Sequence, residues 1–158
     1  MKLAEALAER ADIDKKIAQL RERAKASARY LEGEEPAESA LALIGDTRQL
    51  LTRRMDLVRR INLTNSETRM VRSSGTVTMT EALAMREFIL AERMLLTDVC
   101  NEASPGKDPY GIRRRKTELP EKTDLPVSHL RAEADNLGRV FRELDSDIQQ
   151  ANWNTELI

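Results

Sequence analysis

Apolar residues recur every three or four positions in four long segments of the chain, which is the spacing of helices that pack against one another. This spacing predicts helices over about residues 2–30, 37–62, 80–101 and 127–151. Gly33 and Pro36 follow the first segment and are typical of a helix end. The last segment keeps one unbroken seam, made of Val127, Leu130, Ala134, Leu137, Phe141, Leu144, Ile148 and Ala151.

The second segment has two apolar seams. One of them consists of Leu41, Ile44, Arg48, Leu51, Met55, Val58, Asn62 and Asn65. The other lies beside it and consists of Leu43, Leu50 and Leu57. Together the seams make a face wider than one neighbouring helix covers, so this segment needs a bundle or an oligomer. Its short connection to the first segment predicts an antiparallel helical hairpin.

Two stretches break the helical spacing. Residues 68–80 are rich in β-branched side chains around a Ser-Ser-Gly turn, which predicts a short β-hairpin. Residues 102–126 hold four of the five prolines and predict a long loop, with a strand over about residues 112–119. The whole chain, residues 1–158, is therefore predicted to be a single all-α domain. Its expected architecture is an antiparallel, four-helix, coiled-coil-like bundle with a small β-hairpin insertion.

Polar residues are expected to gather at one pole of this bundle. Antiparallel pairing of the first two helices places Arg10 near Asn62, and a returning fourth helix ends there as well. Amides in an apolar seam stabilise a helix less than apolar side chains do, so we interpret them first as groups that fix register or cap the bundle in a largely dry apex. A ligand or ion pocket and a subunit interface are the alternatives. The candidate residues are Arg10, Asn62, Asn65, Asn152 and Trp153.

Basic residues form two clusters, although the formal net charge is only −1 and gives no global basic field. One cluster lies at the end of the second helix and in the β-hairpin, and the other lies in the long loop. Such clusters can track a phosphate backbone, but both lack stacking aromatic side chains. A solvated or paired face is the alternative interpretation. The candidate nucleic-acid contacts are Arg59, Arg60, Arg113, Arg114 and Arg115.

Catalytic and metal-binding signatures are missing from the sequence. His129 is the only histidine and Cys100 the only cysteine, so neither a typical zinc site nor the Glu-x-x-His pairs of di-iron bundles can form. We therefore predict no catalytic residue, no metal ligand and no cofactor, and we do not expect an enzyme. Charges recur from the start of the chain, and no apolar run reaches the roughly 18 residues of a membrane span. We expect a cytoplasmic protein without a membrane partner.

Several stretches resemble the septicolysin-like family of uncharacterised bacterial helical proteins. They are residues 1–7, 9–12, Glu32-Gly33 with Pro36, 60–66, 80–83, 142–145, and Asn152-Trp153 with residues 155–157. The resemblance implies a small helical protein that self-associates, with a hexamer as one assembly. Its family name also implies a cytolysin.

These observations favour an uncharacterised homo-oligomeric protein with a structural or interaction role. The physical driver is surplus apolar surface on the second and third helices, because each large side chain removed from water contributes roughly 1.5–3 kcal/mol. Three alternatives stay open: a nucleic-acid-binding protein, a protein that binds a small ligand or metal at the polar pole, and the cytolysin implied by the family name.

Overall fold

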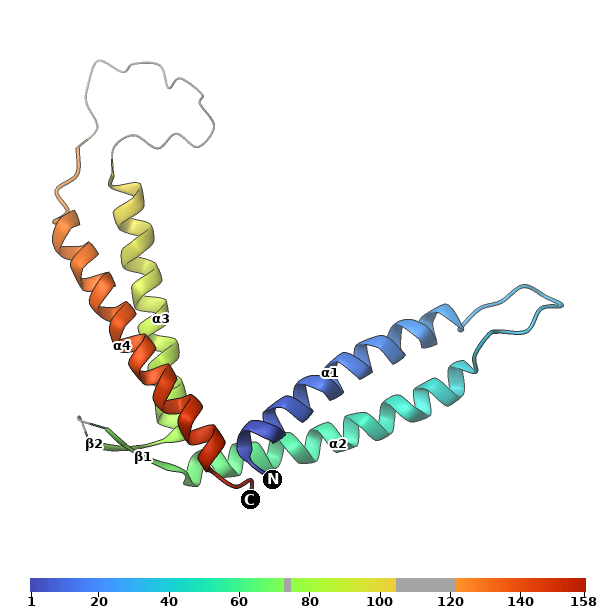
Figure 1. Cartoon of the computed structure of the whole chain (residues 1–158). Helices are drawn as coiled ribbons and strands as arrows, with labels where there is room; N and C mark the ends of the chain where they lie inside the picture. The colour runs from blue at the N-terminus through green and yellow to red at the C-terminus, as the bar shows by residue number, and fades with distance from the viewer. Residues whose placement is uncertain (73–74, 105–121) are drawn as a thin grey trace, which may run out of the picture. The chain divides into compact units, whose positions relative to one another are not determined.

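The computed structural model describes residues 1–72, 75–104 and 122–158 (Figure 1). In these residues four helices and one two-stranded antiparallel sheet are present, which confirms the predicted mostly helical class with its small β-hairpin. In chain order the elements are α1 (Leu3–Ala26), α2 (Ala40–Glu67), β1 (Arg69–Arg72), β2 (Gly75–Thr78), α3 (Met79–Glu102) and α4 (Val127–Asn154).

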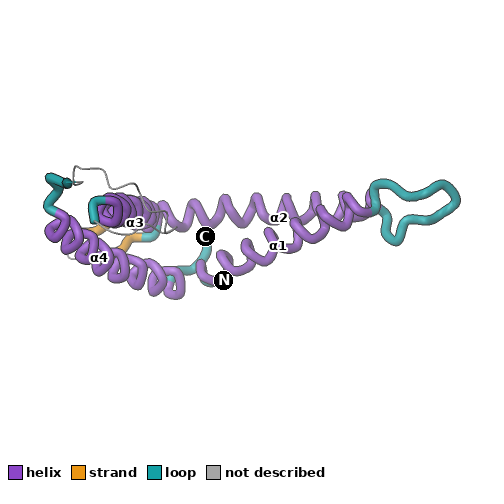
Figure 2. The backbone as a smooth tube through the Cα atoms, turned by 90° about the horizontal axis from the view of Figure 1, so that it is seen from above, coloured by secondary structure: helices purple, strands orange, loops and turns teal. Residues whose placement is uncertain are grey.

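Helices α1 and α2 form the predicted antiparallel hairpin, and they lie side by side in both views (Figures 1 and 2). Two ion pairs join them on the surface, from Arg53 to Glu9 at 2.8 Å and from Arg54 to Asp14. The apolar side chains buried along these two helices are Leu3, Ala6, Ile13, Leu43, Leu57 and Ile61.

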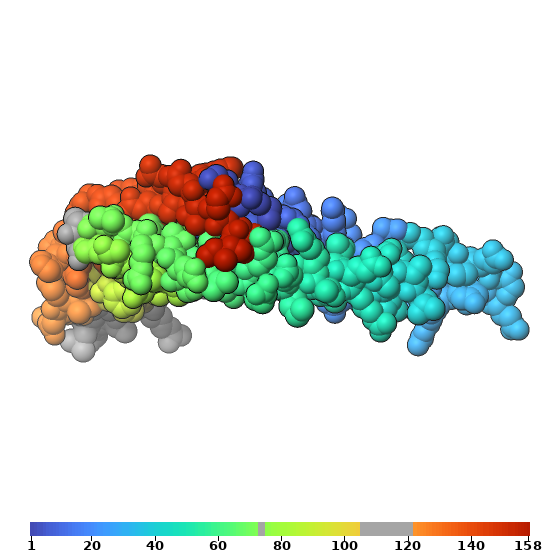
Figure 3. All heavy atoms as spheres, turned by 90° about the horizontal axis from the view of Figure 1, so that it is seen from below, coloured from blue at the N-terminus to red at the C-terminus, as the bar shows by residue number. Residues whose placement is uncertain are grey.

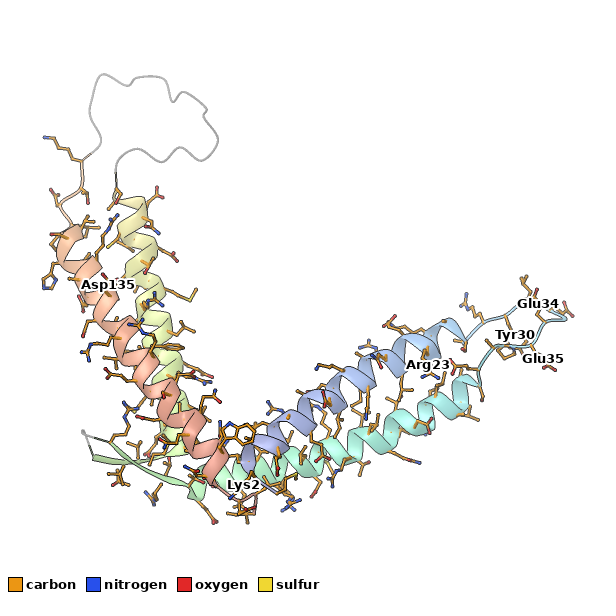
Figure 4. The ribbon with its side chains drawn as sticks, viewed as in Figure 1. Lys2, Arg23, Tyr30, Glu34, Glu35 and Asp135 are labelled. Atoms are coloured by element: carbon orange, nitrogen blue, oxygen red, sulfur yellow. The ribbon has the colours of Figure 1, made fainter. Side chains whose placement is uncertain are left out.

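The connection at the far end of this hairpin is exposed. Figure 4 shows Tyr30, Glu34 and Glu35 in the connecting loop, beyond Arg23 near the end of α1. Gly33 sits in this loop with a φ of 92°, the left-handed conformation that glycine adopts most easily. Helix α1 ends at Ala26, about one helical turn before the predicted end.

Helix α2 continues further than its sequence pattern predicts and ends at Glu67. Its last turns contain Thr64 and Ser66, whose hydroxyls donate to the carbonyl oxygens of Arg60 and Leu63 at 2.9 and 2.8 Å. Such bonds satisfy the hydroxyls within the helix instead of ending it. The helix stops at Thr68, where the extended strand β1 follows.

The β-hairpin pairs Arg69 with Thr78 and Met70 with Val77 in an antiparallel register. Met70 is buried, whereas Val71, on the opposite face of the strand, is 86% exposed. The backbone N–H of Met79 donates to the carbonyl of Thr68 at 2.9 Å, so α3 begins directly where the sheet ends.

Helices α3 and α4 are joined by side-chain contacts. Arg86 pairs with Asp145 at 2.9 Å, and Arg131 donates to the hydroxyl of Ser104 at 2.6 Å. Every residue of the seam predicted for α4 is buried or half-buried, so the spacing identified the packed side of this helix correctly. The predicted strand over residues 112–119 lies outside the described residues.

The described residues divide into two compact units. The first comprises residues 1–80 and 148–158, and its buried side chains include Leu57, Ile61 and Ile148. The second comprises residues 81–147, with Ile89 and Leu144 among its buried side chains. The single domain and the four-helix bundle remain predictions.

Candidate functional site

The polar end of the first unit is built from the first and last residues of the chain. The backbone N–H of Leu3 donates to the carbonyl of Thr155 at 2.9 Å, and that of Leu157 donates to the carbonyl of Met1 at 2.8 Å. Lys2 and Glu156 form an isolated antiparallel bridge between these bonds. Figure 3 shows the last residues (red) lying over α2 beside the first residues (blue). We call this arrangement the terminal clasp: residues 1–3 and 155–158 with Arg60 and Thr64.

Helix α2 contributes two side chains to the terminal clasp. The Thr64 hydroxyl accepts a hydrogen bond from the backbone N–H of Ile158 at 3.1 Å, and Thr64 is fully buried. The guanidinium Nε of Arg60 donates to an oxygen of Ile158 at 2.8 Å. These bonds satisfy backbone groups of the tail that have no helical partner, so they hold the tail on α2.

Glu156 carries the electrostatic part of the terminal clasp. Its carboxylate accepts from the Lys2 ammonium at 2.8 Å and from the Met1 amino group at 3.0 Å. Hydrogen bonds from these two cations hold the pKa of Glu156 below its ordinary value. Glu156 is exposed, so water screens the pairing and its effect on stability is small.

The structure does not assemble the predicted dry pole around Arg10 and Asn62. Glu9, next to Arg10, is paired with Arg53, which precedes Asn62 by about two and a half helical turns. Asn62 is exposed, while Arg10 and Asn65 are half-buried. The expectation of Asn62 inside a dry apex is wrong, because α1 packs on the other seam of α2.

The two candidates at the end of α4 have opposite environments. Asn152 is buried, with 8% of its surface exposed, and lies in the first unit with Ile148 and Leu157. Trp153 is 62% exposed, so its indole does not cap the helices. Successive residues of a helix point in directions about 100° apart, which explains why neighbours differ so strongly.

The arginines near the end of α2 already have acceptors. Arg59 pairs with Asp56 at 3.2 Å, and Arg60 is bonded to Ile158. Paired guanidinium groups are less available to a phosphate backbone than free ones. The other nucleic-acid candidates, Arg113, Arg114 and Arg115, lie outside the described residues.

The first of the two seams of α2 is an exposed candidate surface. We call it the outer α2 seam: Leu41, Ile44, Arg48, Leu51, Met55, Val58, Asn62 and Asn65. Four of its large apolar residues are exposed, at 78% for Leu41, 41% for Ile44, 48% for Leu51 and 67% for Met55. The other seam is turned toward α1, with Leu43 and Leu57 buried. One helix therefore carries a packed seam and an open one.

Helix α3 has a second exposed apolar surface. Phe88 and Leu95, two turns apart, are 66% and 62% exposed, and Met94 is 57% exposed. The buried side chains Ala82, Ile89 and Cys100 lie on a different face of this helix. The predicted surplus of apolar surface on the second and third helices is therefore present.

The described residues contain neither a metal-binding cluster of side chains nor a membrane-spanning helix. Within residues 1–72, 75–104 and 122–158, no three His, Cys, Asp or Glu side chains are grouped so that they would hold a metal ion. Among the helices that the structure describes, none is both long and apolar enough to cross a lipid bilayer.

Thr64 and Glu156 make specific contacts that the sequence interpretation did not single out. Thr64 continues the seven-residue spacing of Leu43, Leu50 and Leu57, so its buried position could have been found from the sequence. Glu156 belongs to a tail without helical or strand periodicity, and no sequence signal identifies Lys2 as its partner.

The fold and its exposed seams define a class of helical protein with open apolar faces, and the comparisons place the chain within one family. Residues 10–157 match a family of unknown function (DUF6847), and the chain belongs to this family. A solved relative is the crystal structure of a functionally unknown conserved protein from Corynebacterium diphtheriae. It is 34% identical with a TM-score of 0.88, and the alignment covers 100% of this chain and 99% of that one. The search of curated proteins finds no match.

The family assignment corrects the predicted resemblance to septicolysin-like proteins, which is wrong. The most specific parts of that resemblance were residues 60–66 and Asn152-Trp153 with residues 155–157, and its other stretches are rich in Ala, Leu, Glu and Arg. These residues are common in any long helix, because their straight side chains lose little freedom there. The cytolysin implied by the family name loses its basis with it.

Proposed function

We propose that this protein is a self-associating structural or interaction protein whose copies meet through exposed apolar helix faces. The observation that carries the proposal is the outer α2 seam, where Leu41, Ile44, Leu51 and Met55 are exposed along one helix. Contiguous exposed apolar surface of this kind marks interaction sites in proteins that are otherwise polar outside.

The energetics of these four side chains suit a reversible association. Burying a large apolar side chain fully contributes roughly 1.5–3 kcal/mol. These residues already have about half of their surface covered, so eight of them from two copies contribute roughly 6–12 kcal/mol. Association costs about 4–15 kcal/mol in lost freedom. Because gain and cost are similar, the fit between the faces decides whether the assembly forms.

The coiled-coil-like bundle and the cytoplasmic location belong to the same proposal. Two α1–α2 hairpins that meet through α2 would bring four helices together, which is how a bundle covers a helix with two seams. The buried, free thiol of Cys100 supports a reducing compartment, where unpaired cysteines are usual.

Light scattering coupled to size-exclusion chromatography tests the proposal on the full chain. We expect a molar mass that is a multiple of 17.9 kDa at micromolar concentration, falling on dilution. The Q49E variant, which adds a charge at an exposed polar position of α2 outside both seams, is the control for nonspecific charge effects. A wild-type chain that stays monomeric over this range would overturn the proposal.

A further inference from the structure

The outer α2 seam has the spacing of a coiled-coil seam along its whole length. Its residues alternate at intervals of three and four from Leu41 to Asn65, and their exposed members are open to a partner. This span exceeds three heptads, the length over which such a pattern is typical of a coiled coil. At 1.5 Å per residue it extends for about 36 Å.

We propose that the outer α2 seam pairs in parallel with the same seam of a second copy of this chain. The inference rests on the proposed function and names its partner and geometry. It draws on the order of residues along the seam: Leu41, Ile44, Leu51, Met55 and Val58 supply apolar layers, and Asn62 and Asn65 supply amide layers.

Parallel pairing places each of these residues level with its own counterpart. Five layers are then apolar against apolar, and two are amide against amide. An amide in a seam is satisfied by a matching amide, which is how asparagine fixes the register of parallel two-stranded coiled coils. Within one copy Asn62 is exposed and Asn65 is half-buried, and both thereby acquire partners in the assembly.

Antiparallel pairing over the same length matches the layers poorly. Reversing the seam sets Leu41 against Asn65 and Ile44 against Asn62, so amides would meet apolar side chains. A polar group buried without a partner costs stability. Arg48 is the one residue that favours reversal, because parallel pairing brings it level with the same residue of the partner. Its long side chain can extend its charge to water at the edge of the seam.

Engineered disulfides distinguish the two directions. In a C100A background, L41C and N65C are prepared as separate variants, with A18C on the exposed surface of α1 as the control for random collision. Parallel pairing predicts that L41C crosslinks to L41C and N65C to N65C. Crosslinking only in a mixture of the two variants would show an antiparallel pair and overturn the inference.

Charge variants test whether this seam, and not α3, is the interface. The L51E/M55E variant is expected to weaken self-association at least about a hundredfold, because it places charges in two central layers. The matched F88E/L95E variant changes the exposed face of α3 and is expected to retain association through α2. Circular dichroism checks that both keep their helices.

The outcomes separate the inference from the proposed function. A monomeric wild-type chain removes both. An oligomer that survives L51E/M55E, or that is lost in F88E/L95E alone, keeps the self-associating function and overturns the α2 pairing.

Discussion

Glu156 and Thr64 show how single polar residues hold an extended tail against a helix. Glu156 is exposed and forms ion pairs with two cations, whereas Thr64 is fully buried and accepts a hydrogen bond from the backbone N–H of Ile158. The same tail is thus fixed by one contact that responds to pH and salt and one that does not. Their contributions to stability can be separated by substitution.

The ion pair of Glu156 predicts a pH-dependent effect on stability. Its pKa is lowered in the folded protein, so its contribution is present above the unfolded pKa and is lost as the pH falls through the folded pKa. We expect E156Q to lower the melting temperature slightly near neutral pH. The difference from wild type should disappear in acid, as measured by calorimetry. E87Q, on the exposed surface of α3, is the control, and an equal difference at both pH values would contradict the explanation.

Replacing Thr64 by valine tests the buried contact. The substitution keeps the shape but leaves the N–H of Ile158 without its acceptor, so T64V should lower the free energy of unfolding by about 1–3 kcal/mol. Thr52 is the matched control, because its hydroxyl also donates to a helix carbonyl but is exposed. T52V should change stability by less than about 0.5 kcal/mol in urea titrations. Equal effects of the two variants would show that the tail contact is not the cause.

Helix α2 has two apolar seams that meet different fates in the folded chain. One of its seams packs on α1, and the other stays open for most of its length. The sequence contained both seams and showed that one partner could not cover them. It did not show which seam packs against α1, since both seams have heptad spacing. The packed seam is decided by how well the side chains of α1 fit each seam of α2.

Replacing two glycines of the α1–α2 hairpin by alanine should change the stability of the protein in opposite directions. Gly45 lies within α2 with open space around the position of a β-carbon, so G45A should stabilise the protein by about 1 kcal/mol. Gly33 has a positive φ, so G33A should destabilise it by roughly 1–2 kcal/mol despite equally open space. Chemical denaturation measures both. A stabilising G33A would show that the loop readily takes another conformation.

For the whole molecule, self-association predicts that stability depends on concentration. Assembly of folded copies adds stability by mass action, so the melting temperature of the wild type should rise with protein concentration. The L51E/M55E variant should show little of this dependence, while A18C, reduced and on the exposed side of α1, should keep it. A wild-type melting temperature that is constant over a hundredfold concentration range would argue against assembly.

The predicted polar pole is where sequence reasoning was least successful. Asn152 is buried, whereas Trp153 and Asn62 are exposed. The spacing of Asn62 correctly assigned it to a seam. Whether Asn62 is buried depends on which seam of α2 packs against α1. That packing is decided by residues far away in the sequence.

Local sequence patterns determined the four helices of the described residues, the β-hairpin and the packed side of α4, because these follow from hydrophobic periodicity, β-branched residues and turn residues. The tertiary structure decided which seam of α2 meets α1, and it joined residues 155–158 to residues 1–3. Those choices come from the fit of surfaces that are far apart in the chain, and no local pattern records that fit.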